Sequence, residues 1–248
     1  PNLECLSLSY IILDAAELSS LTNLRALSMT SHLLSEKDPN LKDLAKLRKL
    51  QILDEELPSD ALEDWAKSGG LANLEKFKTG SAISAKYFPK LRAVDLDLTL
   101  SVQDDQSVIR SYGLPKGLKY FHGGGINEEV WQTIARFGNR TSIESLELSF
   151  LDLEFSFGSS RIVDEPSTSK LANFTALKWL EIRGYGVRTF DLNQFKHLEY
   201  LDADNIRSMV EMEGLANHPT LRALTLYNCE VLRSLGPAAP NQKLEFLD

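Results

Sequence analysis

Two aspartates, Asp95 and Asp97, are the residues of this sequence whose spacing comes nearest to acid–base chemistry. Residues two apart in an extended strand point to the same side, about 7 Å from each other, which is a separation that catalytic carboxylate pairs can use. Catalysis also needs a pocket that excludes water and shifts a pKa. Because the surrounding sequence predicts an open strand face, we expect no catalytic residue and no enzyme activity.

Other motifs are too incomplete to carry chemistry. Lys78-Thr79-Gly80 and Ser167-Thr168-Ser169-Lys170 are similar to motifs of penicillin-recognising enzymes, but they occur in the wrong order. Gly123-Gly124-Gly125 is not followed by the Lys-Ser/Thr of a phosphate loop, so we expect it to let the chain turn from a strand into a helix opening at Asn127. The four histidines show no metal-ligand spacing. We therefore predict no metal site and no cofactor.

The composition is that of a globular protein with one bias, since 43 of the 248 residues are leucine. The net charge of -8 argues against a nucleic-acid partner, because the basic residues do not cluster. No apolar run reaches the roughly 18 residues of a membrane span, so we expect no membrane partner. The chain begins at Pro1 with no targeting segment, which favours a processed or excised piece.

The leucines recur in a frame. Leu3-Glu-Cys-Leu6-Ser-Leu8 returns as Leu91-Arg-Ala-Val94-Asp-Leu96 and as Leu221-Arg-Ala-Leu224-Thr-Leu226. The first position is leucine in ten of eleven frames, the fourth is Leu, Val or Phe in all of them, and a further apolar residue often lies three residues before the frame. The frames begin near residues 3, 24, 50, 74, 91, 118, 143, 177, 198, 221 and 244.

A frame L-x-x-L-x-L at this period resembles the leucine-rich repeat superfamily. The irregular spacing is similar to the intracellular type, found in plant-type immune receptors and F-box adaptors. The resemblance implies an α/β fold, a right-handed solenoid with a curved parallel sheet on its concave side and helices, 3₁₀ turns and loops on its convex side. It also implies one continuous domain over residues 1–248.

Helix signals lie between the frames. Two capping boxes are predicted, with Asp14 and Asp60 as the helix N-caps and Glu17 and Glu63 as their partners at position N3. Asp38-Pro39 precedes leucines at 41, 44 and 47 at helical spacing. Asn127 opens a segment with Val130, Trp131, Ile134 and Phe137 inward and Gly138 as a stop. The Ser-, Gly- and Pro-rich stretch 154–170 reads as an exposed insertion.

The two cysteines lie nine strands apart in this arrangement. At about 4.8 Å a strand, roughly 40 Å would separate Cys5 from Cys229, whereas a disulfide needs Cα atoms within about 7 Å. We expect Cys229 to be a small buried core residue and Cys5 to be partly exposed. Two free thiols favour a reducing compartment, so we predict a cytoplasmic protein, with secretion left open.

Third, fifth and seventh frame positions point away from the core of such a strand. Across the chain nine of these residues are acidic, and only Lys76, Lys78 and Arg183 are basic. Aromatic residues rimmed by charge are typical of protein-binding hot spots. We predict a binding face for a basic and apolar protein partner, made by Trp179, Glu181, Arg183, Tyr200, Asp202, Asp204, Tyr227, Tyr120, Asp95 and Asp97.

These features predict a non-catalytic protein-recognition module. Our leading hypothesis is the ligand-sensing part of a larger intracellular receptor. A substrate-recognition arc of an F-box-type ubiquitin ligase adaptor and the targeting arc of an enzyme whose catalytic domain is absent are alternatives that predict the same fragment. A polar face that merely keeps the sheet soluble is the simpler interpretation of the acidic residues.

Overall fold

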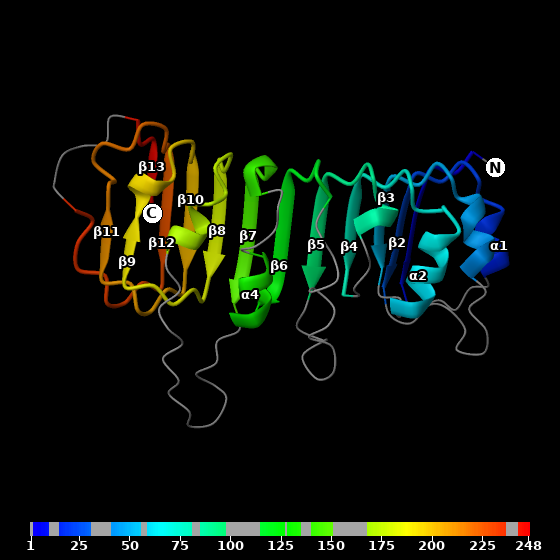
Figure 1. Ribbon diagram of the computed structural model, residues 1–248, viewed down its shortest axis with the longest axis horizontal. Helices are drawn as coiled ribbons and strands as arrows, with labels where there is room; N and C mark the ends of the chain where they lie inside the picture. The colour runs from blue at the N-terminus through cyan, green and yellow to red at the C-terminus, as the bar shows by residue number, and fades with distance from the viewer. Residues whose placement is uncertain are drawn as a thin grey trace, which may run out of the picture. The chain divides into compact units, whose positions relative to one another are not determined.

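The computed structural model describes residues 2–9, 15–30, 41–55, 59–80, 85–97, 115–126, 128–134, 140–150, 168–236 and 243–248. These residues form two compact units, Pro1–Leu118 and Lys119–Asp248, and each is described by itself. In both units a short parallel strand alternates with a return segment (Figure 1).

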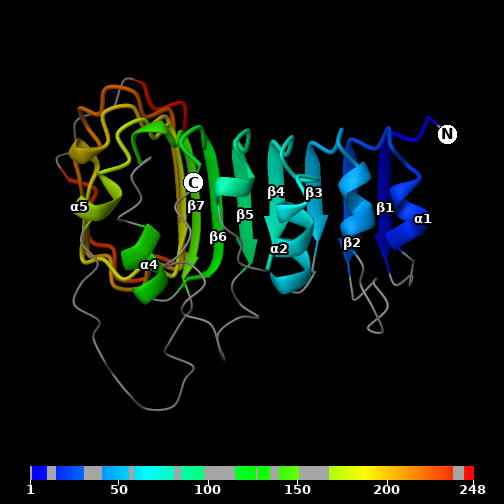
Figure 2. The same cartoon turned by 45° about the vertical axis from the view of Figure 1, so that its right-hand side comes forward.

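Unit 1 contains five parallel strands that pair in chain order, from β1 to β5. Among the described residues of this unit, helices α1 and α2 lie on one face of the sheet (Figure 2). The elements are β1 (Cys5–Ser9), α1 (Ala15–Ser19), β2 (Ala26–Thr30), η1 (Leu41–Lys46), β3 (Ile52–Glu55), α2 (Ser59–Lys67), β4 (Lys76–Thr79), η2 (Ala85–Tyr87) and β5 (Ala93–Asp97).

Unit 2 contains six parallel strands in the order β6, β7, β8, β10, β12 and β13, and a second small sheet formed by β9 and β11. The elements are β6 (Tyr120–Ile126), α4 (Glu128–Ile134), η3 (Arg140–Ser142), β7 (Ser145–Phe150), α5 (Thr168–Leu171), β8 (Trp179–Arg183), β9 (Thr189–Asp191), η5 (Leu192–Gln194), β10 (Tyr200–Asp204), β11 (Glu211–Glu213), β12 (Ala223–Tyr227) and β13 (Phe246–Leu247).

Each of these main-sheet strands begins at the third residue of a leucine frame, from Cys5 of the frame at 3 to Phe246 of the frame at 244. The leucines at the first and fourth positions supply the core. Leu24 and Leu27 are buried in unit 1, and Leu198 and Leu201 are buried in unit 2. The fold class predicted from the sequence, α/β with parallel strands on one side and helices, 3₁₀ turns and loops on the other, is confirmed.

The apolar residue three positions before a frame closes a tight turn. The Leu24 N–H donates to the Leu21 carbonyl at 2.9 Å, and the same bond joins Leu177 to the Phe174 carbonyl at 3.1 Å. The turn satisfies a backbone donor and buries the side chain, which explains why the sequence places apolar residues there. Leu47, Leu71, Phe88, Phe174 and Phe195 are buried at this position.

His218 takes this position in the tenth frame and uses its ring to hold the backbone. It is buried, and its Nδ1 accepts from the Leu221 N–H at 3.0 Å. Because Nδ1 accepts, Nε2 carries the proton and donates to the Phe195 carbonyl at 2.9 Å. Burial lowers the pKa of His218, so the neutral ring is favoured.

The return segments differ from the predicted helices in detail. Helix α2 begins at Ser59, so Asp60 lies inside the first turn instead of capping it. Residues 41–46 form the 3₁₀ helix η1, because leucines spaced by three match its three residues per turn better than the 3.6 of an α-helix. In α4, Trp131 and Ile134 are buried as expected. Asp14, Asp38, Pro39, Asn127, Phe137, Gly138 and residues 154–167 of the expected insertion lie outside the described residues.

The three glycines at 123–125 lie inside β6, so the prediction that they form the turn after the strand is wrong. The β6–β7 register shifts between Gly123 and Ile126, and Gly125 has a φ of 68°. A side chain on Gly123 would put its Cβ 2.9 Å from the Ile126 side chain. The glycines therefore make a β-bulge that turns Ile126 into the core.

The second sheet of unit 2 was not predicted. Glu211 pairs with Thr189 and forms an isolated bridge with Ser234, so a second extended segment recurs in the last repeats. Phe190 and Met212 from these strands are fully buried. The signal was present in the sequence as a second apolar position, at Phe190, Met212 and Leu235, beyond each frame.

Both cysteines are free thiols, as predicted. Cys5 is exposed, and Cys229 is only half-buried, so the prediction that Cys229 is a buried core residue is wrong. Its Sγ lies 3.6 Å from the Ala203 carbonyl and 3.6 Å from the Tyr227 carbonyl. Burial is the main cause that raises the pKa of this thiol, which disfavours the reactive thiolate.

Candidate protein-binding surface

The main sheet of unit 2 has one face turned to the core and one face left open. Along β8, Leu180 and Ile182 are fully buried, whereas the alternate residues Trp179 and Arg183 are exposed. The helices α4 and α5 lie on the core side of the strands (Figures 1 and 2). The open side is therefore made by frame positions three, five and seven, as the sequence predicted.

We call the open side of five strands in unit 2 the acidic–aromatic face. Its residues are Tyr120, His122 and Gly124 of β6, Ser145, Glu147 and Ser149 of β7, Trp179, Glu181 and Arg183 of β8, Tyr200, Asp202 and Asp204 of β10, and Ala223, Thr225 and Tyr227 of β12.

The strand register sorts these residues into rows. Tyr200 pairs with Trp179 at position three, and Asp202 pairs with Glu181 at position five. Glu181 pairs in turn with Glu147, so three carboxylates follow one another at the strand spacing of about 4.8 Å. An aromatic row thus runs beside an acidic row, both perpendicular to the strands.

The aromatic row contains a stacked pair. The rings of Trp179 and Tyr200 are 3.7 Å apart between centroids, with planes inclined by 16°. Trp179 nevertheless keeps 44% of its surface exposed. Tyr227, at the seventh frame position of β12 and outside this row, is 62% exposed. Large aromatic side chains held in place at low entropic cost are what protein interfaces use as anchors.

The one guanidinium of the acidic–aromatic face, Arg183, lies among carboxylates. Its Nη2 is 2.9 Å from Glu181 Oε1, and its Nε is 3.7 Å from Asp204 Oδ2. Glu147, Glu181, Asp202 and Asp204 supply four carboxylates in this set. The face therefore carries an excess of negative charge that its own side chains do not neutralise.

Burial destabilises the charged form of two of these carboxylates, Glu181 and Asp202. Burial, and then the neighbouring Glu147, raise the pKa of Glu181, while Arg183 acts against them. Burial also raises the pKa of Asp202, with Asp204 adding to the effect and Arg183 opposing it. A raised carboxyl pKa means that the charged carboxylate is less stable in the folded protein than in water. An approaching cation would relieve this cost.

A hydrogen-bonded group at the β6 end of the same row includes two residues, Glu147 and His122, that the sequence-based prediction missed. The Tyr120 hydroxyl donates to Glu147 Oε2 at 2.9 Å, and His122 Nε2 lies 3.5 Å from Glu147 Oε1. Glu147 and His122 occupy the fifth frame position, like Glu181 and Asp202. The frame position was the signal that could have found them.

A residue in the left-handed conformation follows each of the strands β8, β10 and β12. Gly184, Asn205 and Asn228 occupy the eighth frame position with φ values of 67°, 56° and 51°. Gly and Asn are the residues that adopt this conformation at least cost. The turn sends the next residues, Tyr185 and Ile206, into the core. It also leaves the seventh-position side chains on the open side, at the sheet edge.

The structure places the predicted site residues in both units. Tyr120, Trp179, Glu181, Arg183, Tyr200, Asp202, Asp204 and Tyr227 share the acidic–aromatic face of unit 2. Asp95 and Asp97 belong to β5 of unit 1, where the side chain of Asp97 lies outside the described residues. Lys78 of β4 pairs with Asp95, so the open side of unit 1 has its own mixed charge.

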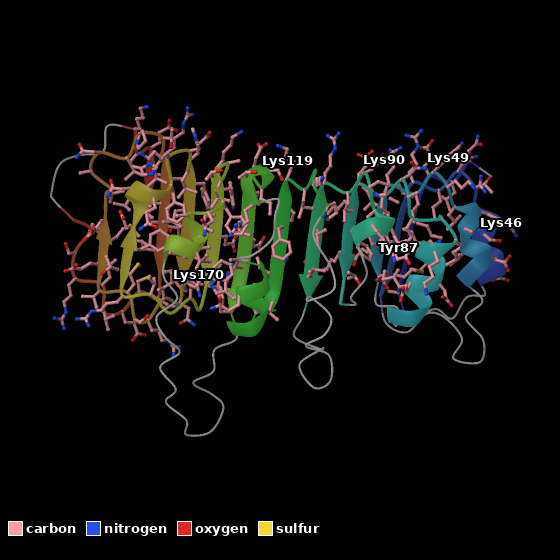
Figure 3. The ribbon with its side chains drawn as sticks, in the orientation of Figure 1. Lys46, Lys49, Tyr87, Lys90, Lys119 and Lys170 are labelled. Atoms are coloured by element: carbon pink, nitrogen blue, oxygen red, sulfur yellow. The ribbon has the colours of Figure 1, made fainter. Side chains whose placement is uncertain are left out.

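Three lysines, Lys49, Lys90 and Lys119, lie at the edge where the strands begin instead of on the open side (Figure 3). In unit 1, Lys49 Nζ donates to Asn23 Oδ1 and Lys90 Nζ donates to Asn73 Oδ1, both at 2.7 Å. In unit 2, Lys119 Nζ lies 2.6 Å from Glu144 Oε1. These lysines already have polar partners within the edge and do not offset the carboxylates of the open side.

Other chemistry has little support among the described residues. No group of three or more His, Cys, Asp or Glu residues in that part of the chain is placed to hold a metal ion. Thr79 of the Lys-Thr-Gly motif lies on β4, buried, and donates to Glu55 Oε1 at 2.6 Å. No described helix is long and apolar enough to cross a membrane.

Comparison with known proteins finds likeness at the level of the fold. No family model matches the chain, and no curated protein matches it. An internalin from Listeria monocytogenes is similar in structure at 16% identity and a TM-score of 0.47, covering 96% of this chain and 71% of its own. A leucine-rich repeat protein from Leptospira interrogans is similar at 16% identity and a TM-score of 0.45, covering 100% and 78%. The chain itself, with a parallel strand at each leucine frame, has the leucine-rich repeat fold.

Proposed function

We propose that the chain is a non-catalytic protein-recognition module and that the acidic–aromatic face docks a partner protein presenting basic side chains among apolar ones. The observation that carries the proposal is the pairing of an exposed, stacked Trp179 with a row of carboxylates whose negative charge is only partly offset. Complementary charge steers the approach of such a partner, and the aromatic side chains supply the apolar contact.

The shape of the rows favours a protein segment over a small ligand. Glu147, Glu181 and Asp202 lie on three successive strands, so their row extends over roughly 10 Å. A basic segment laid across the strands could meet the carboxylates with one side and Trp179 with the other. The open sheet gives a small molecule little enclosure by comparison.

The wider context is part of the same proposal. We infer that the chain is one domain and serves as the ligand-sensing part of a larger intracellular receptor, located in the cytoplasm. The two free thiols support a reducing compartment. The negative charge of the acidic–aromatic face supports a protein partner over a nucleic acid.

The test compares capture by two double variants. Trp179→Ala with Asp202→Lys removes the exposed aromatic side chain and reverses a charge of the acidic row. Val231→Ala with Glu211→Lys truncates an exposed apolar side chain and reverses an acidic charge outside the acidic–aromatic face. Proteins captured from a lysate are identified by mass spectrometry, purified and titrated against each variant.

We expect a captured protein with a basic surface that binds the wild type and the Val231/Glu211 variant but not the Trp179/Asp202 variant. Circular dichroism should be the same for all three chains. Equal binding to both double variants would contradict the docking site.

A further inference from the structure

Arg183 is a cation on the acidic–aromatic face, which otherwise carries an excess of carboxylates. Its side chain is 55% exposed, and both of its ion pairs are made within the face, to Glu181 and Asp204. A guanidinium is planar and carries donors in a fork that matches carboxylates. The arrangement therefore shows that this place between β8 and β10 accommodates a guanidinium.

Arg183 does not satisfy the carboxylates around it. Its contact to Asp204 Oδ2 is long, at 3.7 Å. The other oxygen, Asp204 Oδ1, is buried and has no hydrogen-bond donor within the described residues. Asp202 also makes no ion pair among the described residues. Its carboxylate accepts a hydrogen bond from Tyr200. These two carboxylates therefore keep acceptor capacity that Arg183 does not use.

The bond that Arg183 makes is also easily exchanged. The Arg183 side chain is 55% exposed, so water competes for the guanidinium, although the Glu181 side chain is only 16% exposed. A guanidinium of a bound partner would be shielded from water by that partner. Because the local dielectric is lower there, its ion pair with the carboxylate becomes stronger. It could also lie against the exposed ring of Trp179, on the same strand as Glu181.

We propose that Arg183 occupies, in the free protein, the position that an arginine side chain of the partner takes in the complex. Arg183 is then an internal competitor that lowers the affinity of the face for arginine-rich segments and is displaced when one binds. This inference rests on the proposed function of the acidic–aromatic face. It adds the chemistry of the recognised side chain and a residue that sets the affinity.

The test uses defined peptides on the full chain. The probe is acetyl-Arg-Leu-Arg-Leu-Arg-Leu-Arg-amide, with the Lys-Leu and Glu-Leu peptides of the same length for comparison. Binding is measured by isothermal titration calorimetry at low ionic strength for the wild type, Arg183→Gln and Arg183→Lys. The matched control is Arg222→Gln, since Arg222 is similarly exposed and ion-paired, to Glu245 at 4.0 Å, but precedes β12 outside the face.

We expect Arg183→Gln to bind the Arg-Leu peptide roughly three- to ten-fold more tightly than the wild type, because it removes a competing ion pair. Arg222→Gln, with the same loss of charge, should stay within about twofold, as should Arg183→Lys, which keeps the competing charge. The Lys-Leu peptide should bind the wild type more weakly than the Arg-Leu peptide, and the Glu-Leu peptide should not bind.

The outcomes separate the inference from the function on which it rests. If the wild type binds the Arg-Leu peptide and Arg183→Gln binds it equally or more weakly, the competitor role of Arg183 is wrong while the docking face stands. The competitor role is also wrong if Arg222→Gln or Arg183→Lys tightens binding as much as Arg183→Gln. If the wild type binds neither basic peptide, the proposed function fails and the inference fails with it.

Discussion

The indole of Trp179 and the phenol ring of Tyr200 stack face to face across two neighbouring strands, with centroids 3.7 Å apart. The stack fixes the Trp179 side chain while 44% of its surface stays exposed. A rigid exposed ring loses little conformational entropy when a partner covers it, which is the property of an interface anchor. The relationship between these two residues is the main reason for placing the binding site here.

The stack makes Trp179 a spectroscopic probe. The chain has three tryptophans, and Trp65 and Trp131 are fully buried. Acrylamide should therefore quench one of the three, and Trp179→Phe should abolish the quenchable fraction. Tyr200→Ala should raise the quenching constant of Trp179, because the indole loses the ring that covers one of its faces. A quenchable fraction that persists in Trp179→Phe would show that the indole exposures are assigned wrongly.

Asp202 of the acidic row should cost stability at neutral pH. Burial raises the pKa of Asp202 above its ordinary 3.8. The folded protein then binds this proton more tightly than the unfolded chain, so stability increases as the pH falls through the raised pKa and levels off below 3.8. Asp202→Asn should therefore raise the melting temperature at pH 7, and the gain should vanish at low pH.

The same substitution should weaken binding of the Arg-Leu peptide at pH 7, because a carboxylate of the row is lost. Gain in stability with loss of binding is the signature of a residue kept for function. The matched control is Glu211→Gln, which removes an exposed carboxylate of β11 outside the acidic–aromatic face. If Asp202→Asn destabilises the protein at pH 7, the raised pKa is wrong in sign.

His218 should make the fold sensitive to mild acid. Burial lowers the pKa of its ring below the ordinary 6.5, and its Nδ1 accepts a backbone hydrogen bond only while unprotonated. Below pH 6.5 the unfolded chain takes up the proton before the folded one, so stability falls as the pH decreases from 6.5 toward the lowered pKa. His218→Leu, which restores the apolar residue of other repeats, should flatten this part of the profile.

Urea unfolding followed by circular dichroism at a series of pH values between about 7 and 5 measures that slope. His197→Gln is the control, since His197 is exposed in the turn before the ninth frame. We expect the control to keep the slope of the wild type. An unchanged slope in His218→Leu would contradict the role assigned to the ring.

The fourth frame position should carry much of the stability. Leu201 is fully buried, and its truncation leaves a cavity that the neighbouring repeats cannot fill. Leu201→Ala should lower the free energy of unfolding by about 2–5 kcal/mol. Ser149→Ala, at an open-face position of β7, should change it by less than about 0.5 kcal/mol. Similar urea midpoints for the two variants would contradict the frame.

The sequence predicted the strands well and the return segments less well, for a physical reason. Every repeat needs apolar side chains at the first and fourth frame positions to fill the narrow coil. Leu198 and Leu201 occupy these positions in the ninth frame, so the frame predicts directly where β10 begins. Return segments are held by varied local bonds. A 3₁₀ helix replaces the α-helix expected after Leu41, and the strands β9 and β11 lie where loops were expected.

The candidate face was predictable only as a set of positions. Frame parity placed Trp179, Glu181 and Arg183 on one side of a strand, and the burial pattern of β8 agrees. Frame parity does not predict which side chain of a neighbouring strand a residue contacts. Tyr200 has a tryptophan on one neighbouring strand and Ala223 on the other, and it stacks on the tryptophan because only that side offers a ring.

The central claim is that the acidic–aromatic face binds a basic and apolar protein surface. Its most direct test is the affinity of the Arg-Leu peptide, measured by calorimetry for the wild type, for Trp179→Ala/Asp202→Lys and for Val231→Ala/Glu211→Lys. We predict that the Trp179/Asp202 variant loses at least about tenfold in affinity, whereas the control variant stays within about threefold of the wild type. Equal losses in the two variants would contradict the claim, because binding would then follow the overall charge of the chain instead of this face.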